Sequence, residues 1–375
     1  MNDCKTAAAG RALLYARPET WIEGDAVRQL AHAAERRGVI AAAGFPDLHP
    51  GKYGPVGCAI LADGVVHPEL VGTDIGCGMS LYALDLPVRK IKAEKASERM
   101  RKLADDWEID AIQAGSSHGF VTGHEAVLGT VGGGNHFCEL QAVHEIRDAC
   151  KAAEYGIEAG MSLLLVHTGS RSLGAALFGK HWNGSDQGID IGNGGSEYLA
   201  DHEIAVRFAS LNRNLVAGRA ADALRTEAKL LLDVPHNFVE TTSVGLLHRK
   251  GAAVADRGLV PVPGSRGSFT YILQPLLGDP ASLRTIAHGA GRKHDRRWME
   301  AKAKGDRSSR KRFAESGMGS RIICDDKKLA VEESPMAYKD IEAVIGDLEA
   351  FGLARVVAVT RPLVTYKSAQ GRQGR

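Results

Sequence analysis

Glycine-rich clusters constrain the fold of this chain more than any other feature. Its 375 residues include 44 glycines, and many of them gather in short clusters spread over most of the sequence. Glycine permits backbone conformations that side chains forbid, and it lets the main chain approach a ligand closely. Polar residues lie in or beside these clusters, which is typical of loops that converge on one site. The clusters are GFPDLHPGKYGPVG (44–57), GTDIGCG (72–78), GTVGGGNH (129–136), HTGSRSLG (167–174), GNGG (192–195), PGSRG (263–267) and HGAGR (288–292).

Apolar patterns between the clusters predict an α+β fold. Apolar residues at helical spacing predict helices over residues 25–37, 91–107, 142–155 and 196–232. Short apolar runs predict strands over residues 57–61, 79–84, 162–167, 269–273 and 355–360. Strands and helices do not alternate strictly, so a doubly wound sheet is disfavoured. Because no repeat or linker divides the chain, the sequence predicts one domain over residues 1–375.

Composition leaves several classes of protein open and disfavours others. The net charge of +2 neither requires nor excludes a nucleic-acid partner, because a local basic surface can bind phosphates on a nearly neutral protein. No apolar run is long enough to cross a membrane, and the first residues lack the apolar core of an export signal. We therefore expect a cytoplasmic protein without a membrane partner. The scattered cysteines argue against a disulfide framework. They are Cys4, Cys58, Cys77, Cys138, Cys150 and Cys324.

Good metal ligands stand in several of these short motifs. Asp74 and Cys77 lie three residues apart in one glycine-flanked loop, and His136, His167 and His236 each follow a turn or a strand. Taken singly, each residue has an ordinary explanation as an inert buried cysteine, a turn residue or a core histidine. Their joint occurrence predicts a site for one or two divalent ions, with the thiolate able to bridge. Ligand chemistry alone favours zinc before manganese, so purified protein can carry Zn²⁺ or another divalent ion.

Two further clusters suit phosphate groups. The HGAGR cluster offers backbone N–H groups, the guanidinium of Arg292, and His288, whose neutral imidazole can attack phosphorus. PGSRG at 263–267 is a second candidate nucleotide loop, whereas the P-loop signature GxxxxGK[ST] does not occur. The basic run over residues 292–312 predicts either a solvated helix face or a track for an RNA backbone. Arg171 and Arg292 are the candidates for specific RNA phosphate contacts.

The ordered motifs resemble the RtcB family of RNA ligases. The resemblance extends over about residues 44–367, in the order of the family. The motifs are FPDLHPGKYGPVG, VGTDIGCGM, GTVGGGNHFCEL, LLVHTGSRSLG, HNFVE with HRKGA, PGSRG, HGAGR and ESPMAYKDIEAVI. The WIEGDAVRQL opening and PDLHPGKYGPVG are similar to the bacterial branch that is coupled to a release-factor-H-type protein.

This resemblance implies a compact domain with central β-sheets, flanking helices and a cleft for metal and nucleotide. It implies a ligase that uses GTP and two Mn²⁺ ions to join RNA with a 2′,3′-cyclic phosphate or 3′-phosphate to RNA with a 5′-hydroxyl. His288 would carry GMP. Asp74, Cys77 and His136 would bind one ion, and Cys77, His167 and His236 the other. The implied GTP-binding positions are Asn135, His136, Phe137, Cys138, Glu139, His236, Asn237, Pro263, Gly264, Ser265, Arg266, Thr270, His288, Gly289, Ala290, Gly291 and Lys367.

Two positions depart from the family pattern, and two other functions stay open. Arg266 stands where many members have methionine, which adds a charge near the nucleotide and could change guanylate affinity. Thr270 stands where serine is common and keeps the hydroxyl. One alternative is a metal-dependent phosphohydrolase that trims RNA ends without joining them, since the same metals would serve a water nucleophile. The other alternative is a non-catalytic RNA-binding protein.

Overall fold

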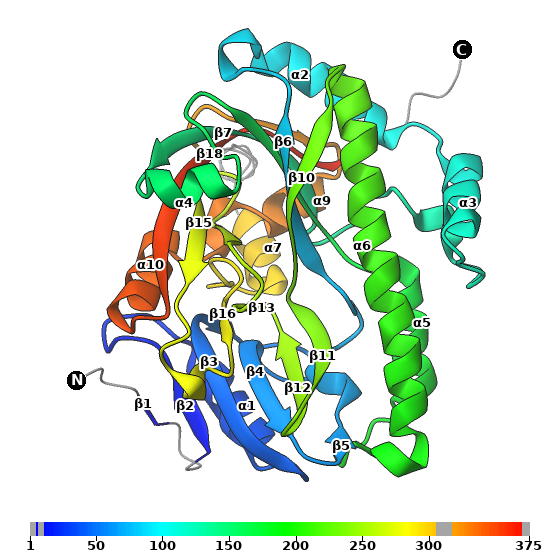
Figure 1. The fold of residues 1–375 in the computed structure, drawn as a ribbon, viewed down its shortest axis with the longest axis vertical. Coiled ribbons are helices and arrows are strands. Elements are labelled where there is room, and N and C mark those ends of the chain that lie inside the picture. The colour runs from blue at the N-terminus through cyan, green and yellow to red at the C-terminus, as the bar shows by residue number, and fades with distance from the viewer. Residues whose placement is uncertain (1–4, 7–10, 305–316, 370–375) are drawn as a thin grey trace.

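The computed structural model describes residues 5–6, 11–304 and 317–369, and two curved sheets dominate it (Figure 1). The smaller sheet has the strand order β1-β2-β3-β4-β12-β11. The larger sheet has the order β10-β6-β8-β7-β18-β15-β14, with β17 also paired to β18. Most pairs are antiparallel, and β2–β3 and β17–β18 are parallel. Mixed sheets with separate helices confirm the predicted α+β class, while a single domain stays a prediction.

The strands of the smaller sheet are β1 (Lys5–Thr6), β2 (Ala12–Leu14), β3 (Val39–His49), β4 (Val56–Ala62), β11 (Asn237–Thr242) and β12 (Gly245–Lys250). Those of the larger sheet are β6 (Gly78–Leu84), β7 (Phe137–Ile146), β8 (Ser162–Thr168), β10 (Ala228–Pro235), β14 (Val260–Pro263), β15 (Thr270–Pro275), β17 (Arg321–Cys324) and β18 (Ala354–Ser368). Two short pairs are β5 (Val65–Val66) with β9 (Ile189–Asp190), and β13 (Ala252–Val254) with β16 (Thr285–Ala287). The α-helices are α1 (Gly24–Ala34), α2 (Ala93–Met100), α3 (Glu108–Ser117), α4 (Ala149–Glu154), α5 (Arg171–His181), α6 (Ser196–Leu224), α7 (Arg296–Lys304), α9 (Lys327–Glu332) and α10 (Ile341–Ala350).

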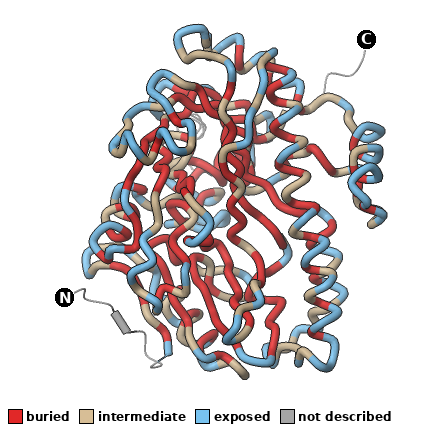
Figure 2. The backbone as a smooth tube through the Cα atoms, in the orientation of Figure 1, coloured by how far each residue is buried: buried red, intermediate tan, exposed pale blue. Residues whose placement is uncertain are grey.

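Strand β8 shows why the larger sheet is buried on both faces. Its sequence SLLLVHT is apolar without alternation, and every residue in it is buried. Leu163 and Leu165 point into the core that fills the space between the two sheets. Leu164 and Val166 point to the other face, where they pack with α6 and α2. A continuous apolar run is therefore a strand covered on both sides, and Figure 2 shows this run of buried strands through the centre of the molecule.

Two predicted helices are partly wrong. Residues 142–146 extend strand β7 and only Ala149–Glu154 are α-helical, so the helix predicted over 142–155 is confined to its second half. The helix predicted over 196–232 ends at Leu224, because Arg225 adopts a left-handed conformation with φ 64°. Residues 228–235 instead form β10, which pairs with β6. In both cases strand pairing overrides local helical preference.

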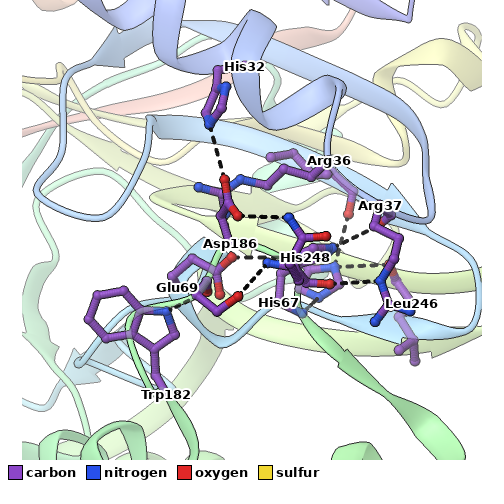
Figure 3. Close-up of polar contacts among 12 residues, drawn as sticks. His32, Arg36, Arg37, His67, Glu69, Trp182, Asp186, Leu246 and His248 are labelled. Atoms are coloured by element: carbon purple, nitrogen blue, oxygen red, sulfur yellow. Dashed lines mark hydrogen bonds and ion pairs between the residues drawn. The ribbon is translucent and has the colours of Figure 1, made fainter.

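A buried polar network joins the turn after helix α1 and the short helix η1 (Pro68–Leu70) to the smaller sheet (Figure 3). His67 donates through Nε2 to the carbonyl of Arg37 at 2.9 Å, and its backbone N–H donates to His248 Nε2 at 2.9 Å. Arg36 donates to the Glu69 carboxylate, which also faces His67 Nδ1 at 3.3 Å. The network fixes the chain immediately before the loop that carries Asp74.

Among the described residues, no helix is long and apolar enough to span a membrane. Cys58, Cys77, Cys138, Cys150 and Cys324 are free thiols, in agreement with the expected lack of a disulfide framework, and Cys4 lies outside the described residues.

Candidate metal and nucleotide site

The predicted metal ligands gather where neighbouring strands of the larger sheet end. Cys77 immediately precedes β6, His136 precedes β7, and His167 lies near the end of β8. His167 pairs with Met79 on one side and Phe137 on the other, so strand register brings these three segments together. His236 lies between β10 and β11, at the point where the chain passes from the larger sheet to the smaller one.

Donor atoms of these residues face one another at short distances. Cys77 Sγ lies 3.4 Å from His136 Nε2 and 3.2 Å from His167 Nε2. His167 Nε2 lies 3.3 Å from His236 Nε2, and His136 Nε2 lies 2.7 Å from Asp74 Oδ2. The donor atoms of Cys77, His136 and His167 all lie within 4.8 Å of one another, close enough to hold one metal ion. The structure thus brings all five predicted ligands into one continuous group.

The electrostatics of this group fit a divalent ion. Burial, followed by the Asp74 carboxylate, raises the pKa of the Cys77 thiol well above its usual value. Burial also lowers the pKa of His167 and His236 well below the usual value, so both imidazoles are neutral. The Nε2 atoms of these two neutral imidazoles face each other at 3.3 Å, so both can present their lone pairs to one shared ion. A bound divalent ion would displace the thiol proton, as metal ligation by cysteine requires.

A buried arginine on α6 braces the two segments that carry the central ligands. Arg213 is 1% exposed and donates through Nη1 to the carbonyls of Gly76 at 2.8 Å and Thr168 at 3.1 Å. These carbonyls belong to the residues next to Cys77 and His167. Arg213 Nε donates to Asp233 Oδ1 at 2.7 Å, which anchors the guanidinium in turn. Through Arg213, helix α6 therefore holds in place the two segments that carry Cys77 and His167.

His288, the predicted nucleophile, is oriented by an aspartate that the sequence analysis did not identify. His288 directly follows β16, and its Nδ1 donates to Asp47 Oδ2 at 2.8 Å. Asp47 is fully buried on β3, and Lys339 Nζ donates to the carbonyls on either side of it at 2.9 and 2.7 Å. A side chain at Gly291 (φ 70°) would place Cβ 2.1 Å from the Asp47 carbonyl oxygen, so only glycine fits there. The GFPDLHPG cluster contains Asp47, but its spacing alone did not single out this residue.

The Asp47 contact determines the chemistry of His288. With the proton held on Nδ1, the lone pair of Nε2 is available as a nucleophile. The His288 side chain is 11% exposed, and its ring centroid lies 4.5 Å from that of the metal-ligand candidate His236. The predicted nucleophile therefore lies beside the predicted metal ligands, at the edge of a cavity.

That cavity, of about 270 Å³, is lined by most of the predicted nucleotide-binding residues. The lining includes Asn135, Phe137, Glu139, His167, Pro263, Gly264, Ser265, Arg266, His288, Gly289, Ala290, Gly291, Arg292 and Lys367. Five predicted positions do not line it, and two of these, His136 and His236, belong to the group of predicted metal ligands. The other three are placed differently. Cys138 points into the core on the opposite face of β7, Asn237 bonds the backbone of Asp74 and Gly251, and Thr270 accepts from Gln141. Their side chains support the cavity without lining it.

Arg266 of PGSRG, the candidate nucleotide loop, lines the cavity as predicted for a nucleotide-binding position. Arg266 does not extend its charge toward the centre of the cavity, because its guanidinium donates to the carbonyls of Glu333 at 2.6 Å and Ala330 at 3.0 Å. The Glu333 side chain is 1% exposed and forms ion pairs with Arg292 at 3.0 Å and Lys367 at 3.6 Å. Lys367 and Arg292 hold the pKa of this buried carboxyl at about 2.

Arg292 is less available for RNA phosphates than the sequence suggests. Besides Glu333, its guanidinium bonds the carbonyls of His294 and Glu332 at 3.1 and 2.8 Å. Arg171 lies with Arg296 around a second cavity that also contains Asp74 and His136. Arg296 belongs to the described part of the basic run, and residues 305–312 of that run lie outside the described residues.

Arg171 occupies its place because of glycine on the opposite loop. Its backbone is left-handed, with φ 55°, and Nε donates to Thr130 Oγ1 at 3.3 Å. A Cβ atom at Gly132 would fall 1.8 Å from Arg171 Nη1. The guanidinium thus lies directly on the backbone of the glycine-rich loop that precedes His136.

Comparison with known proteins identifies similar chains over nearly the whole length. Residues 29–118 and 109–368 match the family described as tRNA-splicing ligase RtcB. The chain is 39% identical to RNA-splicing ligase RtcB2 of Escherichia coli over 366 residues, which cover 95% of each chain. It is 30% identical to RNA-splicing ligase RtcB of Mycobacterium tuberculosis, over 90% of this chain and 100% of that protein. It is 28% identical to tRNA-splicing ligase RtcB of Archaeoglobus fulgidus, over 91% and 92%. The matched residues include the candidate metal ligands, His288 and Lys367.

Proposed function

This chain belongs to the RtcB family of RNA-splicing ligases, and on that premise we propose that it joins RNA ends with GTP and Mn²⁺. The proposed substrates are RNA ending in a 3′-phosphate or 2′,3′-cyclic phosphate and RNA beginning with a 5′-hydroxyl. The observation that carries the proposal is the Asp47–His288 pair, 2.8 Å apart, beside a cluster of thiol, imidazole and carboxylate donors. A nucleophilic imidazole next to a metal site suits nucleotidyl transfer.

His288 begins the proposed reaction. Its Nε2 attacks the α-phosphorus of GTP, and a phosphoramidate N–P bond forms as the bond to pyrophosphate breaks. The Nδ1 proton stays in the hydrogen bond to Asp47, and the carboxylate stabilises the positive charge that develops on the ring. GMP then passes from His288 to the RNA 3′-phosphate, and the N–P bond breaks. The 5′-hydroxyl of the second RNA finally attacks this activated phosphate, displaces GMP and closes the phosphodiester. A cyclic phosphate is first opened by water.

The proposed metal ligands are Asp74, Cys77 and His136 for one Mn²⁺, and Cys77, His167 and His236 for the other. Bound divalent ions supply charge neutralisation at the phosphates that react. The buried, mutually facing donor atoms support this assignment, while the preference for manganese follows from the family.

RNA phosphates are proposed to contact Arg171 and Arg296 across the cavity that holds Asp74 and His136. Arg292, which we predicted as a direct phosphate ligand, supports the cavity through Glu333 and reaches RNA less easily. Coupling to a release-factor-H-type protein stays a prediction from the sequence resemblance.

Labelled GTP tests the proposal directly. Protein incubated with Mn²⁺ and α-labelled GTP is expected to form an acid-labile GMP adduct. His288→Ala should abolish the adduct and still bind metal, whereas His118→Ala, a change at an exposed histidine on another surface, should behave as wild type. Normal ligation by the His288→Ala variant would overturn the assignment.

The same sample distinguishes ligation from phosphohydrolysis. A 3′-phosphorylated RNA and a 5′-hydroxyl RNA are supplied together with GTP and Mn²⁺. A longer product supports the ligase, while a dephosphorylated end without any joined product supports the phosphohydrolase.

A further inference from the structure

Arg266 lies in the wall of the proposed nucleotide cavity, and its guanidinium is bonded to the protein backbone. The residue is 5% exposed and follows β14 in the turn to β15. Its two terminal nitrogens donate to the carbonyls of Ala330 and Glu333, and its own carbonyl accepts from Ser320 Oγ at 3.1 Å. Helix α9 ends between those two acceptors, at Glu332. The last carbonyls of a helix have no partners within it, and a cation there is favourable. Arg266 therefore caps α9.

The capped segment carries the carboxylate that organises one wall of the cavity. Glu333 Oε2 accepts from the Tyr338 hydroxyl and lies 3.6 Å from Lys367 Nζ, while Oε1 accepts from Arg292 at 3.0 Å. Tyr338, Lys367, Arg292 and Glu333 all line the same cavity. The position of one buried carboxylate thus determines where an ammonium and an aromatic ring stand relative to a bound nucleotide.

We propose that Arg266 is a positioning residue for nucleotide selection, acting through Glu333 on Lys367 and Tyr338. The inference rests on the proposed function, because it takes the cavity as the GTP site. An ammonium offers only donors, so a correctly held Lys367 favours an acceptor such as the 6-oxo group of guanine over the 6-amino group of adenine. If the cap is removed, two buried carbonyls lose their donors and residues 330–333 can move. The carboxylate of Glu333, which holds Lys367 by an ion pair, is then no longer fixed in place.

A role in folding alone is the competing explanation, and Arg99 provides the control. Arg99 lies on α2 and donates through Nη1 to the carbonyl of Leu224, the last residue of helix α6, at 3.1 Å, and it does not line the cavity. Replacement by methionine keeps the length of the side chain and removes the charge at either position. Both variants are expected to melt at a lower temperature than wild type, because each loses hydrogen bonds to the end of a helix.

The experiment measures GMP-adduct formation by the full chain with GTP and with ATP, each as a concentration series. Arg266→Met should raise KM for GTP about tenfold with kcat nearly unchanged, and should reduce the preference for GTP over ATP by a similar factor. Arg99→Met should leave both quantities at wild-type values. Glu333→Gln, which keeps the shape of the side chain, should reproduce the Arg266→Met result, and Arg266→Lys should recover part of the preference.

Each outcome is decisive. An unchanged KM and an unchanged GTP preference in Arg266→Met, with only a lower melting temperature, would overturn the inference. If Arg266→Met does not fold, the Arg266→Lys and Glu333→Gln variants carry the test, and wild-type selectivity in both would equally overturn it. A wild-type protein that forms no adduct with GTP would instead refute the proposed function.

Discussion

Replacing Asp47 by asparagine isolates the electrostatic contribution of the carboxylate that orients His288. The substitution keeps the size of the side chain, and its amide oxygen can still accept the Nδ1 proton. Asp47 is fully buried, and its Oδ1 has no hydrogen-bond partner among the described residues, so turning the amide oxygen toward His288 sacrifices no other bond. What is lost is the negative charge opposite a ring that becomes positive during attack on phosphorus.

The magnitude follows from the bond that is weakened. A hydrogen bond to a charged group contributes about 1.5–3 kcal/mol and a neutral one about 0.5–1.5 kcal/mol, so the exchange costs roughly 1–2 kcal/mol. Because the charge develops only in the reaction, this energy is lost from the transition state. At a factor of ten for each 1.36 kcal/mol, adduct formation should slow roughly 5- to 30-fold. Asp47→Ala removes the acceptor altogether and should slow the reaction further.

A single-turnover assay with labelled GTP and saturating Mn²⁺ measures this step without interference from RNA binding. Asp256→Asn is the matched control, since Asp256 pairs with Arg284 at 2.7 Å outside the cavity. The control should react at the wild-type rate. Adduct formation by Asp47→Asn at the wild-type rate would show that the 2.8 Å contact does not activate His288.

Three other perturbations give distinct expected results. Gly132→Ala should displace the Arg171 guanidinium, 1.8 Å from the new Cβ, so RNA sealing should fall at least about tenfold while adduct formation persists; equal rates of sealing would contradict this. Cys77→Ser should weaken Mn²⁺ binding at least about tenfold in equilibrium dialysis, because it removes the thiolate ligand. Burial lowers the pKa of His202 to about 4 and of His248 to about 3. Both are neutral in the folded state, so the free energy of unfolding should be level above pH 6.5 and fall by up to about 1.4 kcal/mol per pH unit for each below it. Urea unfolding at pH 7.5 and 5 checks this, and equal stability at both values would contradict it.

The sequence predicted those parts of the fold that depend on local pattern. Residues 163–166 are apolar without interruption, and the strand that they form is buried on both faces. Residues 142–146 contain a helix-compatible pattern, and they form a strand because β18, more than 200 residues later in the sequence, pairs with them. The helix that contains α6 was predicted to end too far along the chain for the same reason, because residues 228–235 pair with β6 as a strand.

The site was predictable where residue type alone limits the role. Cysteine, histidine and aspartate in glycine-rich loops identified the ligand cluster, and the structure gathers those residues. Asp47 was not identified because its role depends on contact with His288, which follows β16 and is 241 residues away in the sequence. The environment of Arg266 and Arg292 was equally hidden, because the acceptors that engage their guanidinium groups belong to the end of α9.

The residues of the candidate site come from the two main sheets and from the short β13–β16 pair, whose strand β16 directly precedes His288. Asp47 belongs to the smaller sheet, the thiol and two imidazoles belong to the ends of strands in the larger one, and His236 lies at the crossover between them. The distance between His288 and the predicted metal ligands therefore depends on how these sheets pack against one another through their shared apolar core. Substitutions deep in that interior can shift one sheet relative to the other. Such a shift would slow the proposed reaction even if every hydrogen bond within each sheet remained. Such a shift would change the 4.5 Å distance between the ring centroids of His236 and His288.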